Sequence, residues 1–159
     1  MKRYIAFLLL SIAVFQLFGC ANSTNTTSVN FYYCTANPQY HSQASVIQAE
    51  QRKVGTTLSD LEGILHMYFE GPTSTKLISP FPAGTKLKTV HHGKEVTEIV
   101  LSNEIATLTG VELMLACASL ASTVMEISQA EAVQIRAETQ LLNNQEFIEF
   151  TAQSLHSFS

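Results

Sequence analysis

Residues 109–127, TGVELMLACASLASTVMEI, form a stretch in which only Glu112 and Glu126 carry a charge. A helix built from this stretch is apolar or small on nearly all its faces, which is typical of a helix that is buried on every side. The stretch is too short and too rich in serine and threonine for a membrane span, which needs about 20 predominantly apolar residues. We therefore expect a buried helix that begins at Thr109, with Glu112 three residues later, and forms the centre of the core.

A second helix is predicted over residues 57–70, where the apolar residues recur at intervals of three and four. Thr57 and Asp60 resemble a capping box at its start, and Gly71-Pro72 ends it, because glycine accepts a left-handed cap and proline cannot continue a helix. The residues of the apolar face are Leu58, Leu61, Ile64, Leu65, Tyr68 and Phe69.

Extended segments surround the two helices. Residues 29–34 are rich in β-branched and aromatic side chains, and residues 132–137 alternate between apolar and polar positions, as strands with one buried face do. Gly93 suits a hairpin turn, Asn143-Asn144 suits another, and the charges of residues 45–54 indicate an edge strand. The predicted strands are 29–34, 45–54, 86–91, 94–101, 132–137 and 146–151. The expected fold is α+β, with a mixed sheet of four to six strands and two helices packed on one face.

The N-terminus has the layout of a secretory signal, with a basic head at Lys2 and Arg3 and an apolar run over residues 4–18. The run ends in Leu17-Phe18-Gly19-Cys20, which resembles the lipobox of bacterial lipoproteins. The resemblance implies that the thiol of Cys20 receives a lipid such as palmitate and that the chain is cut just before it. We therefore expect a lipid-anchored protein on the extracytoplasmic face of the cell membrane.

The chain then divides into four parts: a signal peptide (1–19), the lipidated cysteine with a flexible tether (20–28), a single domain (29–151) and a C-terminal tail (152–159). Loss of the signal leaves 7 basic against 13 acidic residues, a net charge of −6. A chain with this balance is not expected to bind nucleic acid, which needs clustered Lys and Arg. The four lysines between residues 76 and 94 form either a solvated loop and hairpin or a small patch for an anionic envelope polymer; they are Lys76, Lys86, Lys88 and Lys94.

The order of these elements resembles that of the GerMN domain. The motifs that carry the resemblance are LEGILHMYFEGP (61–72), LISPFPAGTKL (77–87), VTEIVLS (96–102) and, after the apolar helix, AVQIRAE (132–138). This family occurs in envelope lipoproteins and in sporulation and germination proteins of endospore-forming bacteria. The resemblance implies a fold similar to the ring-building motifs of secretion complexes, with no assigned catalytic residues. Sporulation members carry two tandem copies, whereas this chain has room for one.

Candidate chemistry is sparse. No nucleophile elbow, HExxH zinc motif or P-loop occurs. Adjacent His91 and His92 point to opposite faces of a strand, His66 suits the polar side of its helix, and Glu62 and Glu70 suit an ordinary helix surface. We therefore expect no metal, no cofactor and no catalytic residue.

Three aromatic residues and two cysteines leave alternatives open. Phe31, Tyr32 and Tyr33 form either a sugar-binding platform or, for two of the three, part of the core. Cys34 and Cys117 form either a disulfide, which an oxidising exterior permits, or two buried thiols. A nucleophilic Cys34 would need a neighbouring histidine and an electropositive setting, of which the sequence gives no local sign.

The sequence thus favours a non-enzymatic, membrane-tethered protein whose GerMN-like domain mediates protein–protein assembly in the envelope, and the family resemblance implies a setting in sporulation or germination. Its expected partners are the membrane, through the lipid on Cys20, and another protein or a second copy of the chain. The alternative is a binding module for cell-wall glycan or another small envelope ligand.

Overall fold

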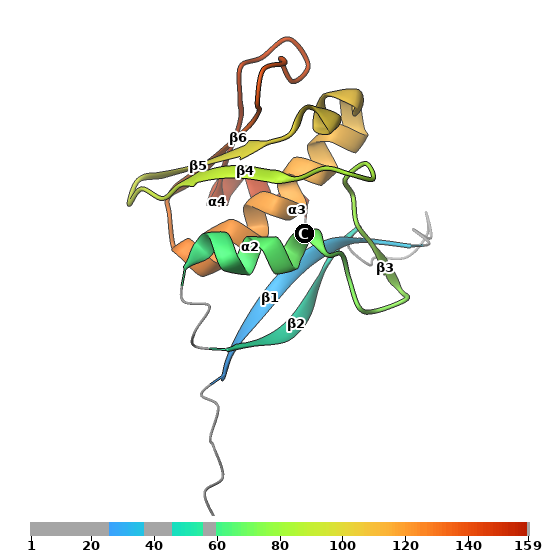
Figure 1. The fold of residues 1–159 in the computed structure, drawn as a ribbon, viewed down its shortest axis with the longest axis vertical. Coiled ribbons are helices and arrows are strands. Elements are labelled where there is room, and N and C mark those ends of the chain that lie inside the picture. The colour runs from blue at the N-terminus through green and yellow to red at the C-terminus, as the bar shows by residue number, and fades with distance from the viewer. Residues whose placement is uncertain (1–25, 37–45, 56–59, 159) are drawn as a thin grey trace, which may run out of the picture.

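The computed structural model describes residues 26–36, 46–55 and 60–158. The predicted signal peptide, the lipobox with Cys20, the break at Asn37-Pro38 and the start of the predicted capping box at Thr57 lie outside the described residues. The chain folds into two sheets with helices between them (Figure 1).

The first sheet is antiparallel and contains β1 (Thr26–Thr35), β2 (Ile47–Gly55) and β3 (Leu77–Ile78) in the order β2-β1-β3. As predicted, β2 lies at an edge. Residues 26–28 were expected in the tether, but they form the first part of β1, because they pair with residues 53–55 of β2. Strand β1 therefore includes three residues that were predicted to belong to the tether.

The second sheet is mixed and contains β4 (Leu87–His91), β5 (Val96–Leu101), β6 (Ala132–Ala137) and β7 (Ile148–Thr151) in that order. Strands β5 and β6 run parallel, and the other neighbours are antiparallel. The parallel pair needs a long crossover, which the 3-10 helix η2 (Asn103–Thr107) and the helix α3 (Gly110–Ser128) supply.

The two predicted helices pack side by side between the sheets. Helix α2 (Leu61–Phe69) contacts β4 and α3, and α3 contacts β1 on one side and β6 on the other (Figure 1). Both helices thus cover the same face of the four-stranded sheet. The first helix was predicted to begin at Thr57 with Asp60 in its first turn, but the backbone of Asp60 is extended and caps a helix that begins at Leu61. Thr109 is the N-cap of α3, as predicted, and neither Asp60 nor Thr109 makes a capping hydrogen bond through its side chain.

Helix α3 is the centre of the core, as predicted. Leu113, Leu120 and Val124 are almost fully buried, whereas Leu115 is only partly buried and lines a surface groove. Among the described residues, α3 is also the one helix whose length and composition would suit a membrane span. Its position between two sheets explains this apolar character, because both of its sides contact protein.

The C-terminal part is more ordered than the predicted tail. Asn143 and Asn144 both have positive φ between the paired residues Leu142 and Gln145, which is the geometry of a tight hairpin turn. After β7 the chain forms the short helix α4 (Ala152–Leu155), and the ring of Phe158 packs edge-on against Phe150 at 6.0 Å. Residues 152–158 therefore belong to the fold.

The α+β class is confirmed, and the mixed four-stranded sheet with two helices on one face matches the predicted arrangement. The sequence did not reveal that the N-terminal strands form a separate sheet on the other side of the helices.

Candidate functional site

The strongest polar cluster of the described residues joins β2 to the loop after α2. The carboxylate of Glu50 accepts a hydrogen bond from Nε of Arg52, and it also accepts from the backbone N–H and hydroxyl of Thr73 and the N–H of Ser74, at 2.9–3.1 Å. The side chain of Glu50 is only 9% exposed. Burial alone would raise its pKa, but these hydrogen bonds outweigh burial and lower the pKa of Glu50 to about 2.

Arg52 extends this cluster to the end of α2. Its guanidinium donates to the carbonyls of Gly71 and Met67 and lies over the rings of Phe31 and Tyr33, 5.1 and 5.7 Å from their centroids. Gly71 has a φ of +90°, which an L side chain rarely adopts. The cluster holds the Gly71-Pro72 turn against β2, so the EGP motif has a structural role.

An aromatic cluster lies beneath this turn. Tyr33 and Tyr68 stack with parallel rings 4.8 Å apart, and the hydroxyl of Tyr33 donates to the carbonyl of Tyr68. Phe31 and Tyr33 are fully buried, whereas Tyr32 is partly exposed and donates its hydroxyl to Glu126. The interpretation that two of the three aromatic residues 31–33 belong to the core is therefore confirmed. Burial and then the bond to Glu126 raise the pKa of Tyr32 to about 12.

Cys34 and Cys117 are both free and buried. Burial raises the pKa of the Cys34 thiol, and a contact with the hydroxyl of Ser119, 3.8 Å away, offsets part of this rise. Burial also raises the pKa of the Cys117 thiol, to about 12. A reactive cysteine requires the opposite shift. Of the two alternatives for this pair, the structure has the buried thiols.

The histidines that the structure describes are not grouped with other metal ligands. Within residues 26–36, 46–55 and 60–158, no group of three or more His, Cys, Asp or Glu side chains could hold a metal ion. Nδ1 of His92 lies 3.2 Å from the hydroxyl of Thr97. His66 is exposed on α2, 4.0 Å from Glu62.

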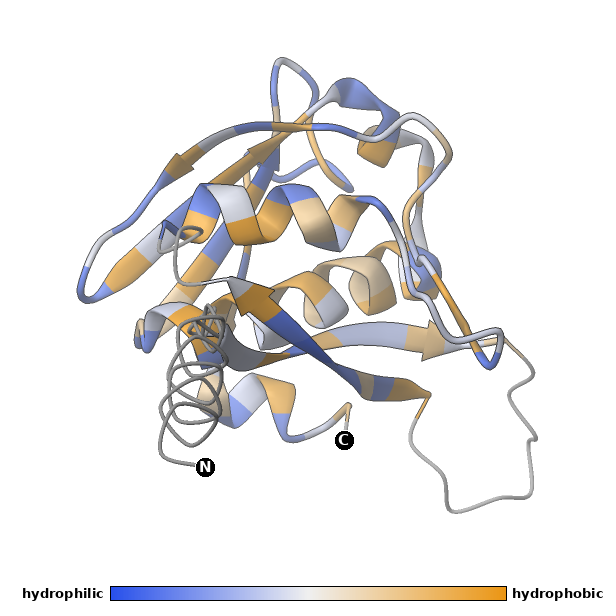
Figure 2. Cartoon of the chain, turned by 60° about the horizontal axis from the view of Figure 1, so that its bottom comes forward, coloured by the Kyte–Doolittle hydropathy of each residue, from blue (hydrophilic) through white to orange (hydrophobic). Residues whose placement is uncertain are grey.

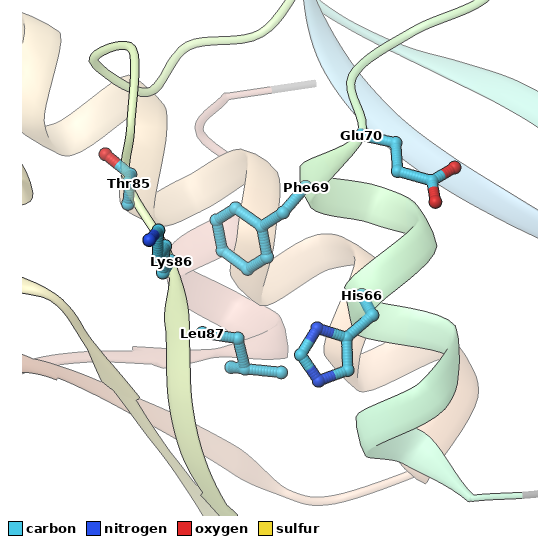
Figure 3. A pocket seen from close by; sticks show the side chains of 6 residues that line it. All are labelled: His66, Phe69, Glu70, Thr85, Lys86 and Leu87. Atoms are coloured by element: carbon cyan, nitrogen blue, oxygen red, sulfur yellow. The ribbon is translucent and has the colours of Figure 1, made fainter.

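His66 also lines a pocket of about 400 Å³ between α2 and the start of β4 (Figure 3). Its ring faces Leu87 across the pocket, whereas the carboxylate of Glu70 points away from it. The pocket thus holds no pair of acid and base side chains. The remaining lining residues are Phe69, Thr85 and Lys86.

A larger groove of about 680 Å³ lies at the end of the first sheet where β1 and β3 meet the start of α3. Its lining is mainly apolar and includes Ile78, Phe81 and Leu115, and Ile78 is half exposed. The prolines of the FPAGT motif, Pro80 and Pro82, form one wall.

All four lysines between residues 76 and 94 are exposed. They are spread over the loop before β3, the start of β4 and the β4–β5 turn, and Lys88 forms an ion pair with Glu138 at 3.2 Å. This arrangement matches the solvated loop and hairpin more closely than a patch.

Sequence reasoning missed the Glu50–Arg52 cluster and the groove. The charges of β2 indicated an edge strand, but their partners lie 15 to 24 residues further along the chain. The groove is formed by four segments that are distant in sequence, and no local pattern marks it.

The fold is similar to three solved structures. The first GerMN domain of the sporulation protein GerM from Bacillus subtilis matches with 16% identity and a TM-score of 0.58, over 80% of this chain and 99% of that one. The tandem GerMN domains of the same protein match with 14% identity and a TM-score of 0.60, over 84% of this chain and 48% of that one. A protein assigned as a lipoprotein from Clostridium perfringens matches with 16% identity and a TM-score of 0.50, over 85% of this chain and 93% of that one. The chain therefore spans about half the length of the tandem protein. A search of curated proteins found no match.

A family model described as "Germane: Sporulation and spore germination" matches residues 30–142. These residues include both sheets up to β6, both long helices and the two turn motifs on which the GerMN resemblance rests. The chain belongs to the Germane family of sporulation and spore germination domains.

Proposed function

We propose that this protein is a non-enzymatic lipoprotein, anchored by a lipid on Cys20 to the outer face of the cell membrane, whose Germane domain assembles with another protein or with itself. The setting that its family supports is sporulation or germination. The lipobox-like sequence before Cys20 supports the anchor, and the similar fold of the Clostridium perfringens protein assigned as a lipoprotein is consistent with it.

The observation that supports the assembly role is an open strand edge and an apolar groove on the surface of the domain. Among the described residues, the strongly interacting polar groups are used within the fold, as Glu50 and Arg52 are. Open surfaces of the described residues include the outer edge of β2 between Ala49 and Lys53 and the apolar groove beside Phe81. An unpaired strand edge and an apolar surface are the features through which one protein binds another.

The glycan-binding alternative has weaker support. A sugar platform needs exposed aromatic faces, but Phe31 and Tyr33 are buried and the hydroxyl of Tyr32 is held by Glu126. The larger groove beside Phe81 is lined mainly by apolar side chains, whereas a small-ligand site also needs a few convergent polar groups.

The test is crosslinking of the lipidated chain in isolated membranes from vegetative and sporulating cells with a lysine-reactive reagent. We expect complexes larger than the monomer, and monomer alone at both stages would contradict the assembly role. Because tethering to one membrane raises the local concentration of weak partners, the membrane-bound chain is the form to test. Hydrolysis of purified peptidoglycan by the soluble domain would contradict the non-enzymatic role.

A further inference from the structure

The outer edge of β2 is paired with no other strand of the described residues. We infer that this edge pairs with the same edge of a second copy of the chain, antiparallel and about a two-fold axis perpendicular to the sheet. The two three-stranded sheets then form one six-stranded sheet. This inference rests on the proposed function, because it names the partner and the surface of the assembly.

Alternate residues of β2 point their backbone groups away from β1. The N–H of Thr35 donates to the carbonyl of Val46 at 2.9 Å, and every second pair of an antiparallel ladder is hydrogen-bonded in this way. In the observed register, Ala49, Gln51 and Lys53 lie in the pairs between these, which are not hydrogen-bonded to β1. Their N–H and C=O groups therefore point to the open edge.

The opposite side of the sheet confirms this alternation. Tyr32 pairs with Ala49, so its backbone also points away from the β1–β2 ladder. Its N–H donates to the hydroxyl of Thr123 at 2.9 Å, and its carbonyl accepts from the hydroxyl of Tyr68 at 3.0 Å. The helices thus close the inner edge of this sheet with side chains. In the described part of the chain, the backbone of Ala49, Gln51 and Lys53 makes no hydrogen bond with a loop or turn.

The other sheet edges are short or irregular, which are the features that prevent strand addition. The ladder of β4 is interrupted by a register shift between Leu87 and Thr89, and β7 has four residues and leads directly into α4. Strand β3 has two residues and is followed by Pro80 and Pro82. Strand β2 pairs with β1 in an unbroken register, so among the described strands its outer edge between Ala49 and Lys53 is the most regular one for pairing.

The charge pattern of β2 favours a second copy as the occupant. A two-fold pairing centred on Gln51 brings the residues from Ala49 to Lys53 of the two copies together. This register places Glu50 opposite Arg52 of the second copy, twice, and the exposed Lys53 opposite the small Ala49. Cross-strand pairs of opposite charge stabilise a sheet, and like charges directly opposite destabilise it.

The neighbouring two-fold registers lack this complementarity. A shift of two residues in one direction places Glu50 opposite Glu50 of the second copy, and the same shift in the other direction places Arg52 opposite Arg52. The charge match therefore selects one of these registers. Figure 2 shows the hydrophilic middle of β2 that carries these charges.

A cysteine at position 51 of the full-length lipidated chain tests the register. In the centred pairing, Gln51 lies opposite itself with its Cα atoms about 5.5 Å apart, within the range of a disulfide. Ala49 is the matched control, because it is exposed on the same face of the same strand. Two cysteines at position 49 would lie about 14 Å apart, four residues along the strand, and cannot form a bridge. The native Cys34 and Cys117 are buried.

After mild oxidation of membranes, we expect Gln51→Cys to give at least ten times more disulfide-linked dimer than Ala49→Cys. Co-expression of Ala49→Cys with Lys53→Cys should also give dimer, because these residues lie opposite each other. A second variant, Gln51→Pro, removes an outward N–H without removing a bond to β1, and it should abolish the complexes trapped by a lysine-reactive crosslinker while the chain stays folded by circular dichroism.

Equal dimer from the two single cysteines would overturn the register. Crosslinked complexes without a Gln51→Cys disulfide would overturn the β2 pairing and leave the proposed assembly role intact. Monomer alone under both treatments would overturn both.

Discussion

Replacement of Glu50 by glutamine tests whether the cluster on β2 stabilises the fold through charge. The substitution preserves the size of the side chain and removes its negative charge. Glu50 accepts hydrogen bonds from Arg52, Thr73 and Ser74 in a site where its side chain is 9% exposed. A charge-assisted hydrogen bond contributes about 1.5–3 kcal/mol, so the variant should be clearly less stable.

The pKa gives the magnitude and the sign. The pKa of Glu50 falls from an ordinary 4.5 to about 2 in the folded protein, and at about 1.4 kcal/mol per pKa unit this fall corresponds to about 3 kcal/mol. The unfolded chain takes up the proton first as the pH decreases. The stabilisation is therefore fully present above pH 4.5 and is lost as the pH falls towards 2.

Urea unfolding of the chain without residues 1–20, measured between pH 2 and 7, checks this prediction. We expect Glu50→Gln to lower the free energy of unfolding by about 2–3 kcal/mol at pH 7 and by much less at pH 2. Glu131→Gln, at an exposed carboxylate, should change it by less than about 0.5 kcal/mol. A difference between wild type and Glu50→Gln that is the same at every pH would refute the role of charge.

Three further substitutions test the anchor, the core and the turn. Cys20→Ala should block processing or release the domain from membranes, and a fully cleaved variant that still fractionates with membranes would show that the lipobox prediction is wrong. Leu120→Ala should cost about 2–5 kcal/mol in denaturant unfolding, because the side chain is fully buried, and the partly buried Leu115→Ala should cost clearly less. Gly71→Val should cost about 1–2 kcal/mol through backbone strain, since no atom within 4 Å would clash with the new Cβ; normal stability with lost binding would mark the turn as a site.

Elements that depend on local pattern could be predicted from the sequence. Helix α3 begins and ends within one residue of the expected bounds, because its apolar stretch and its flanking residues specify it. The β4–β5 hairpin and the asparagine turn at Asn143-Asn144 follow from turn chemistry alone.

Features that depend on long-range pairing could not be predicted. The division into two sheets arises because β1 pairs with β2 and β3, whereas β4 pairs with β5, and alternation within each strand does not show its neighbours. Leu115 has the same apolar side chain as Leu120, but its position on α3 turns it towards the groove. Residues 26–28 are polar enough for a tether, and their pairing with residues 53–55 places them in β1.

The charges of β2 link the stability of the domain to the specificity of its open edge. A strand edge that accepts any extended segment invites aggregation. Glu50 and Arg52 are held by Thr73, Ser74 and Gly71, so they cannot swing away to accommodate an incoming strand of unsuitable charge. An edge with fixed, alternating charges rejects registers that place like charges together and accepts one that places opposite charges together. The contacts that fasten the turn after α2 thereby also restrict which strand can pair with β2, and the chain's own β2 meets that restriction between Ala49 and Lys53.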